Sequence, residues 1–190
     1  MIEICFSTEM GEIRAELFDK QAPLTVAHFL AYIDDGYYNG SSFYRVVRED
    51  NQPPTSVKIS VVEGGFSNRY YDDMLRENFS KGHLYDSALG PRGNRPCICV
   101  ETTANTGLSH VSGTLSLGRC SASEVDNSFF ICVGDQPELD FGGLRAADGL
   151  GFSACGLVTD GMDIVHKIHR SPAQGQKLYQ EVGIIKVSRQ

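Results

Sequence analysis

The opening segment alternates apolar and polar side chains in two short runs. Apolar residues stand at every second position of segment 2–6 and again of segment 13–17. A period of two is typical of a β-strand with one buried face. Gly11 lies between the two runs and supplies turn geometry. We therefore predict a β-hairpin over residues 1–18.

The apolar period then changes to that of a helix. Over residues 22–35, apolar side chains stand at i, i+3, i+4 and i+7, namely Val26, Phe29, Leu30 and Ile33. This spacing places them on one face of an amphipathic helix. Pro23 suits the first turn of this helix and Gly36 ends it. His28 lies off the apolar stripe, and we expect it to face solvent.

A second helix is predicted near the end of the chain. Asp160 is a candidate N-cap, and Pro172 stops the helix. One side of it carries Met162, Val165 and Ile168, and cationic side chains gather in its last turn, where they meet the negative end of the helix dipole.

Short β-rich runs fill most of the remaining chain. They cover residues 43–47, 58–62, 113–117, 128–133, 153–158 and 182–187. Two long stretches, 66–112 and 134–151, read as loops, and loops of this length are often functional. With the hairpin, this makes about eight strands that do not alternate with helices. We therefore predict a single domain over residues 1–190, mainly β, built as a closed eight-stranded antiparallel barrel capped by two α-helices.

Composition narrows the function. The chain carries a net charge of −7 and has no basic cluster, which argues against nucleic-acid binding. It lacks an apolar run long enough to span a membrane and does not start like a signal peptide. We expect a cytoplasmic protein, or a periplasmic one if a leader has been removed.

Cysteine usage also fits an intracellular, reducing environment. Cys5, Cys132 and Cys155 lie in apolar, strand-like segments, where we expect small buried core residues. Cys97 and Cys99 are two apart, and a redox or metal role for them stays a minor alternative, because the chain has no C-x-x-C pair. We expect no cofactor and no metal, and a reducing compartment fits this pattern better than a disulfide framework.

Arg45 stands in the middle of a short apolar run, Phe43–Val47. Such an arginine has three explanations: an outward-facing strand residue, a buried ion pair or a site residue. The alternation of strand faces alone favours the first. The common enzyme motifs G-x-S-x-G, Walker A and H-E-x-x-H are absent from the chain.

An ordered series of motifs favours the explanation of Arg45 as a site residue, because together these motifs resemble the cyclophilins. In that family an F-H-R-[VI]-[VI] strand is followed by a strand ending in Q-G-G. The matching segments of this chain are Phe43–Val47, Glu63–Gly65, Glu77–Phe79, Gly113–Gly118, Ser128–Ile131, Leu139–Asp140, Cys155–Val158 and Gly161–Val165. Each motif is weak alone, but their order covers nearly the whole chain.

The resemblance implies a peptidyl-prolyl cis-trans isomerase, an enzyme that rotates X-Pro peptide bonds without a cofactor. Arg45 would be the catalytic residue, bonding the carbonyl beyond the proline and donating toward the proline nitrogen. The proline ring would lie in an apolar pocket. The residues implied in substrate binding are Phe43, Val61, Glu63, Gly118, Arg119, Phe130, Leu139 and Phe152.

Several of these positions depart from the family pattern. Glu63 replaces the usual Gln, so that it could orient Arg45 or occupy donors that the substrate needs. Gly118-Arg119 replaces Ala-Asn, as in a divergent bacterial branch with a similar 139–152 loop. Phe152 is the best match to a pocket His, and Val61 replaces a methionine. Glu138 replaces a Trp linked to cyclosporin binding, and we therefore expect weak cyclosporin binding.

Three functions are consistent with these residues. The favoured one is a prolyl isomerase (rotamase) that assists protein folding, with proline-containing peptides and unfolded or partly folded proteins as partners. The alternative is a proline-peptide binding module or chaperone with weak or no turnover, suggested by Glu63, Arg119 and the altered pocket. A barrel that serves only as a scaffold is the third, since fold alone does not fix function.

Overall fold

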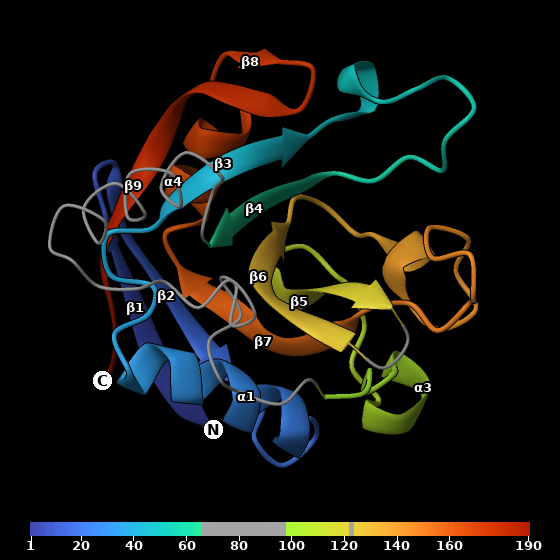
Figure 1. The fold of residues 1–190 in the computed structure, drawn as a ribbon, viewed down its shortest axis with the longest axis horizontal. Coiled ribbons are helices and arrows are strands. Elements are labelled where there is room, and N and C mark those ends of the chain that lie inside the picture. The colour runs from blue at the N-terminus through green and yellow to red at the C-terminus, as the bar shows by residue number, and fades with distance from the viewer. Residues whose placement is uncertain (66–97, 122–123) are drawn as a thin grey trace, which may run out of the picture.

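The structure is a computed structural model that describes residues 1–65, 98–121 and 124–190 (Figure 1). Its sheet has the order β1-β2-β7-β5-β6-β4-β3-β9, and β9 pairs back with β1. All of these pairings are antiparallel. The strands are β1 (Ile2–Thr8), β2 (Gly11–Leu17), β3 (Ser42–Val47), β4 (Val61–Gly65), β5 (Thr114–Ser121), β6 (Glu124–Cys132), β7 (Ser153–Asp160) and β9 (Lys177–Arg189). The predicted closed eight-stranded barrel is confirmed. A two-residue strand, β8 (Ala173–Gln174), extends the sheet beside β9.

Helices cover the barrel as predicted. Helix α1 (Pro23–Asp34) packs on β7 and β9, and α4 (Met162–His169) packs on β2, β3 and β4. Within the described ranges there is one further α-helix, the single turn α3 (Thr103–Thr106), and two 3-10 turns, η1 (Glu49–Asn51) and η2 (Pro137–Leu139). A one-turn helix is too short to show a period, so α3 could not be predicted from the apolar pattern. Among the described residues, no helix has the length and apolar character needed to cross a bilayer.

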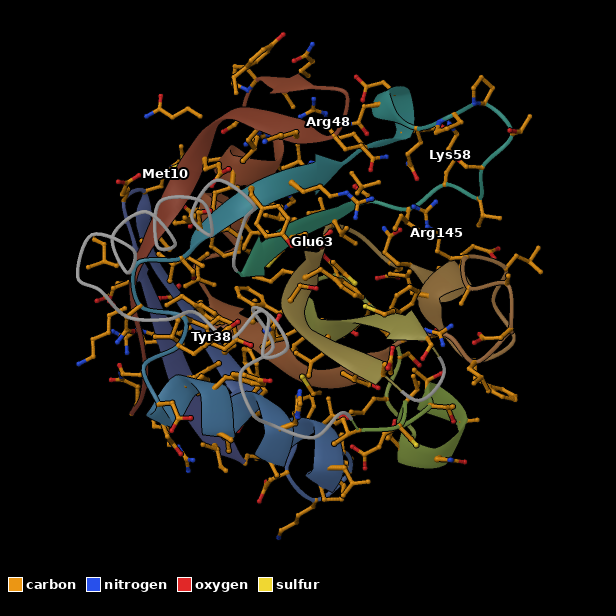
Figure 2. All side chains as sticks on the ribbon, in the orientation of Figure 1. Met10, Tyr38, Arg48, Lys58, Glu63 and Arg145 are labelled. Atoms are coloured by element: carbon orange, nitrogen blue, oxygen red, sulfur yellow. The ribbon has the colours of Figure 1, made fainter. Side chains whose placement is uncertain are left out.

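The barrel interior is filled by a cluster of aromatic rings. Phe129 lies at its centre, with ring centroids 5.1 Å from Phe6, 5.8 Å from Phe29 and 5.6 Å from Phe43. Tyr38 closes the cluster beside α1, and its hydroxyl donates to the carbonyl of Asn127 at 2.7 Å (Figure 2). These rings are almost fully buried. They hold together strands that are far apart in the sequence.

A smaller apolar cluster lies on the other face of β6. Phe130 leaves the strand on the side opposite Phe129, as neighbouring strand residues do. The other members of this cluster are Val47, Ile59, Val61, Cys132 and Leu139, with Phe152 packed against them. The barrel therefore separates a structural core from a second apolar surface, on which the candidate site is built.

One predicted strand was misplaced. The strand predicted over residues 58–62 is in fact β4, Val61–Gly65, and it includes Gly64 and Gly65, which lie beyond the predicted range. A Cβ on Gly64 would lie 2.8 Å from the ring of Phe129 and 2.9 Å from that of Phe43. Glycine is thus present because two core rings press against the strand, and no turn is made at this position.

The expectation for His28 was also wrong, since its side chain is buried. The segment that follows residue 97 contacts α1 at Thr25, three residues before His28. There the backbone N–H and the hydroxyl of Thr25 each donate to Glu101 Oε2 at 2.6 Å. His28 also meets the ring of Tyr32 edge-on at 5.0 Å. A helix covered on two sides buries more than its apolar stripe.

The start of the second helix differs as well. Gly161 is its N-cap, at a φ of 90°, and Asp160 instead accepts a hydrogen bond from the Gly161 N–H at 2.9 Å. A Cβ on Gly161 would lie 2.4 Å from the carbonyl oxygen of Glu12. The close approach of β2 therefore requires glycine here.

The predicted burial of three cysteines is confirmed. Cys5, Cys132 and Cys155 are buried and free, whereas Cys99 is free and exposed. Cys97 and the segment Glu77–Phe79 lie outside the described residues.

Candidate active site

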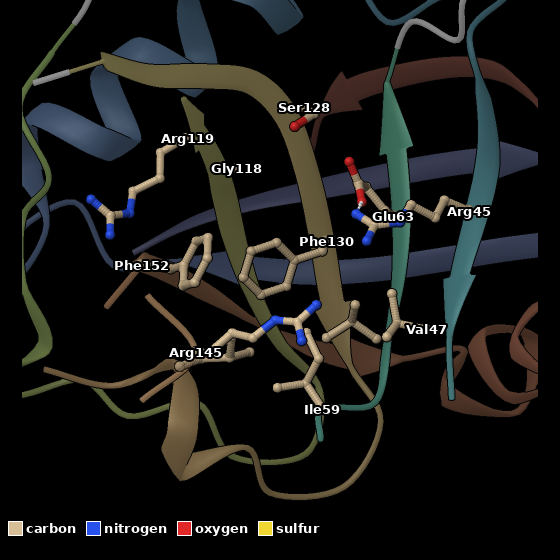
Figure 3. A pocket seen from close by; sticks show the side chains of 12 residues that line it. Arg45, Val47, Ile59, Glu63, Gly118, Arg119, Ser128, Phe130, Arg145 and Phe152 are labelled. Carbon is tan, nitrogen blue, oxygen red and sulfur yellow. Dashed lines mark hydrogen bonds and ion pairs between the residues drawn. The ribbon is translucent and has the colours of Figure 1, made fainter. Parts of the chain in front are cut away.

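The second apolar cluster lines a pocket of about 260 Å³ on the outside of the barrel (Figure 3). The pocket brings together residues from β3, β4, β5, β6 and the loop over residues 138–152. Almost every residue predicted to bind substrate lies in its wall: Arg45, Val61, Glu63, Gly118, Arg119, Phe130, Leu139 and Phe152. The sequence missed four more lining residues, namely Val47, Ile59, Ser128 and Arg145.

Phe43 is the exception. Its side chain is fully buried in the barrel core, with its ring 6.5 Å from that of Phe6. Residues two apart in a regular strand share a face, so Phe43 and Arg45 were expected to point the same way. The pairing register shifts between these two residues, toward both β4 and β9. This irregularity turns Phe43 inward and leaves Arg45 facing the pocket.

Arg45 is held by one side chain from β4 and one from the turn between β8 and β9. Its Nη1 donates to Glu63 Oε2 at 2.6 Å, and its Nε and Nη2 donate to Gln176 Oε1 at 3.0 and 2.6 Å. Glu63 lies opposite Arg45 in the β3–β4 register and also accepts from the Tyr44 hydroxyl at 2.8 Å. Gln176 was not foreseen, because it lies 131 positions away in the sequence.

The Arg45 guanidinium keeps donors for a ligand. A guanidinium has five N–H groups, and the anchors use one on each nitrogen. The side chain is 38% exposed, whereas that of Glu63 is 18% exposed. Glu63 and Gln176 thus fix the orientation of the guanidinium and leave N–H groups on both terminal nitrogens. Of the two roles considered for Glu63, orientation fits this geometry.

Aromatic rings form the apolar floor of the pocket. Phe152 meets Phe130 edge-on, with ring centroids 5.6 Å apart. Behind Phe130 lies the imidazole of His110, stacked at 6.0 Å with an interplanar angle of 18°. Leu139 and Val61 are buried beside them. Such a concave apolar surface suits a proline ring.

Arg119 belongs to the wall of the pocket. Its Nη1 and Nη2 donate to the two carboxylate oxygens of Asp148 at 2.8 and 2.6 Å. These bonds lower the pKa of Asp148 to about 2. The Arg119 guanidinium also lies 5.4 Å from the centre of the Phe152 ring, within range of a cation–π contact. This ion pair fastens the 138–152 loop to β5.

The 138–152 loop holds its shape through its own backbone. The N–H of Gly142 donates to the carbonyl of Gly149 at 2.7 Å, and that of Phe152 donates to Leu139 at 2.9 Å. A Cβ on Gly143 would lie 2.5 Å from the carbonyl oxygen of Glu138. The loop therefore folds tightly enough to fix side chains in the pocket wall. Its irregular backbone has no sequence period, which explains why Arg145 was missed.

A buried hydrogen-bond chain supports Phe130 from behind. His110 Nδ1 donates to Asp140 Oδ1 at 2.7 Å, and Ser116 Oγ lies 3.1 Å from His110 Nε2. Because a carboxylate only accepts, the proton belongs on Nδ1, and the Ser116 hydroxyl donates to Nε2. The order Ser–His–Asp is that of a hydrolytic triad, but Ser116 is fully buried and no substrate carbonyl can reach it. This series of hydrogen bonds therefore has a structural role.

This buried imidazole makes stability depend on pH. Burial lowers the pKa of His110, against the opposing effect of its bond to Asp140. The folded protein therefore takes up the proton at a lower pH than the unfolded chain, whose His has a pKa of about 6.5. The free energy of unfolding should decrease as the pH falls below about 6.5, and His110→Asn should reduce that slope. Urea unfolding of both proteins between pH 7.5 and 5.5 measures how the free energy of unfolding depends on pH.

His169 adds a contribution of the same sign, because burial also lowers its pKa. The His110→Asn variant should therefore keep part of the slope. An unfolding free energy that does not change over this pH range, or the same slope in the variant as in the wild type, would contradict the assignment to His110.

Comparison with known proteins agrees with the predicted family and fold. The family model described as "Cyclophilin type peptidyl-prolyl cis-trans isomerase/CLD" matches residues 2–189. The chain belongs to the cyclophilin-type peptidyl-prolyl cis-trans isomerase family, and the resemblance drawn from its motifs is confirmed.

Two bacterial relatives cover most of the chain. It is 29% identical over 180 residues to peptidyl-prolyl cis-trans isomerase B of Escherichia coli, covering 94% of this chain and 91% of the relative. It is 30% identical over 180 residues to peptidyl-prolyl cis-trans isomerase A of Dickeya dadantii, and this match covers 94% of this chain and 77% of the relative. A cyclophilin-type isomerase of Cryptosporidium parvum, crystallised in the presence of the dipeptide Ala-Pro, has the same fold, with a TM-score of 0.68, 18% identity and coverage of 99% and 98%.

Proposed function

We propose that this protein accelerates rotation about X-Pro peptide bonds and assists the folding of proline-containing chains. The observation that carries the proposal is the orientation of Arg45, which Glu63 of β4 and Gln176 of the β8–β9 turn hold beside an apolar pocket. Family membership supports it, as does the Ala-Pro dipeptide named with the parasite homologue. Unfolded and partly folded proteins are the proposed partners.

The chemistry follows from the electronic structure of the amide. Rotation breaks amide resonance and has a barrier of about 18–20 kcal/mol. In the twisted state the proline nitrogen regains its lone pair, and a hydrogen-bond donor there stabilises this state more than the planar one. Interactions that strengthen only in the transition state are the ones that raise the rate. A guanidinium is always charged and presents several donors in a rigid fork, so Arg45 is suited to this role.

The alternative is a binding module with little turnover. Glu63 favours the binding module, because its carboxylate already accepts a hydrogen bond from Arg45 Nη1 at 2.6 Å. A donor engaged with an anion is less available to a neutral amide. The enzyme remains the better reading, since N–H groups on both terminal nitrogens stay open and the side chain is 38% exposed.

Exchange NMR on an amidated Ala-Ala-Pro-Ala peptide separates these two functions. A catalytic amount of the protein should produce exchange between the cis and trans signals within a second, whereas uncatalysed exchange takes about 10–100 s. Chemical-shift changes without added exchange would establish binding only. With neither effect, the proposed function fails.

Cyclosporin should inhibit this protein weakly, with a Kd of about 1 μM or above. Glu138 stands where the family often has a Trp, and its carboxylate accepts the Leu144 N–H at 2.8 Å within its own loop. A carboxylate offers little of the apolar contact area that an indole would give. Inhibition is measured in the isomerase assay. Glu138→Trp should strengthen it, and nanomolar inhibition of the wild type would contradict the prediction.

A further inference from the structure

Three arginines line the pocket, and two of them are neutralised. Arg45 pairs with Glu63 at 2.6 Å, and Arg119 pairs with Asp148 at 2.6 Å. All four of Arg45, Glu63, Arg119 and Arg145 line the pocket, whereas Asp148 lies outside its lining. The third, Arg145, comes from the 138–152 loop and lies beside Phe130 and Ile59 (Figure 3).

Arg145 is anchored by neutral groups. Its Nη1 donates to the carbonyl of Val57 at 2.9 Å and to Gln52 Oε1 at 3.3 Å. These bonds reach across from the loop to the segment that leads into β4 (Figure 2). In the part of the chain that the structure describes, no carboxylate lies within 4.0 Å of this guanidinium, and its Nε and Nη2 have no hydrogen-bond partner.

The partly buried position of Arg145 makes its positive charge energetically unfavourable. The side chain is partly buried, and burial, with the nearby charge of Arg45 as a second cause, lowers the pKa of Arg145. The group nevertheless stays charged, because an arginine side chain keeps its proton in proteins. A partly dehydrated cation without a counter-ion attracts an anion more strongly than an exposed one, since the effective dielectric constant is lower there.

The free donors also have a particular shape. With Nη1 held by the protein, the Nε and Nη2 edge of the guanidinium remains open. Two parallel N–H groups on one edge match the two oxygens of a carboxylate. The anchoring at Nη1 means that little side-chain freedom is left to lose on binding.

We propose that Arg145 is a specificity-determining residue that selects substrates with a glutamate or aspartate next to the proline. This inference rests on the proposed isomerase function. With the proline ring against Phe130, the neighbouring residues of the peptide lie within the same pocket as the guanidinium. An acidic side chain there forms a bidentate pair with Arg145. Arg45 stays paired with Glu63, and its remaining N–H groups are available to the proline amide.

The test uses four amidated peptides with glutamate or glutamine directly before or directly after the proline. Amidation leaves the side chain as the only carboxylate. In exchange NMR below saturation, the wild type should show a kcat/KM about tenfold higher for a glutamate peptide than for its glutamine partner, at one of the two positions. Arg145→Gln should bring this ratio to about one. Arg145→Lys should keep part of it, because the charge remains and the fork is lost.

Arg170→Gln is the matched control, since it removes the same charge from an exposed position after α4. It should retain the full preference. A wild-type unfolding transition of Arg145→Gln in urea shows that this variant is folded. A wild type that turns over both peptides of each pair equally overturns the inference, as does an Arg145→Gln variant that keeps the preference. A wild type that isomerises none of the four peptides overturns the proposed function instead.

Discussion

Arg45→Ala should lower kcat/KM for X-Pro isomerisation about 100- to 1000-fold, the usual loss when one donor to a transition state is removed. The apolar pocket remains in this variant, so that peptide binding should weaken far less than turnover. Arg45→Lys should recover little, because an ammonium can replace the charge but not the fork that Glu63 and Gln176 hold in place. A protease-coupled assay on a proline peptide measures both variants.

The control for this experiment is Arg170→Ala, which removes an arginine at an exposed position outside the pocket. It should turn over the peptide at the wild-type rate. An Arg45→Ala variant as fast as this control would show that the guanidinium is not the catalytic group. The family assignment would stand, but the site would have to be reassigned.

Phe129→Ala should lower the free energy of unfolding by about 3–5 kcal/mol, as expected when a buried ring leaves a cavity. Phe129 is fully buried and contacts the rings of Phe6, Phe29 and Phe43 at the centre of the barrel. Little can collapse into the space, because these rings come from separate elements that are fixed by the sheet. The change in the urea midpoint at constant slope measures the loss.

Phe130→Ala is the matched control, since it makes the same substitution one residue along β6. This ring faces the pocket, so its loss should reduce stability less and activity more. Equal stability losses for the two variants would contradict the separation of the core from the pocket. A loss below about 1 kcal/mol for Phe129→Ala would contradict its central role in packing.

Much of the fold could be predicted from local pattern. The hairpin, helix α1 and most strands show the expected periods because one face of each is buried in a common core. The errors occurred where tertiary contacts decide the residue type. Gly64 lies beyond the predicted strand 58–62, yet it is a strand residue that packs against two aromatic rings. His28 lies off the apolar stripe, yet its side chain is buried.

The site could be predicted only in part, and for related reasons. Ordered motifs identified Arg45 and most of the apolar wall, since these positions carry the family pattern. Phe43 was wrongly placed in the wall, because a register shift within a short strand leaves no mark on composition or spacing. Gln176 and Arg145 were missed because their roles depend on contacts across 131 and 88 positions of sequence.

The self-contained 138–152 loop has a consequence for protein engineering. Its backbone bonds to itself, and it meets the rest of the pocket through a few side-chain pairs, among them Arg119 with Asp148 and His110 with Asp140. The barrel carries Arg45, while the loop carries Arg145. Grafting this loop between barrels of the same type, together with Arg119 and His110, should therefore transfer the substrate preference that we propose for Arg145.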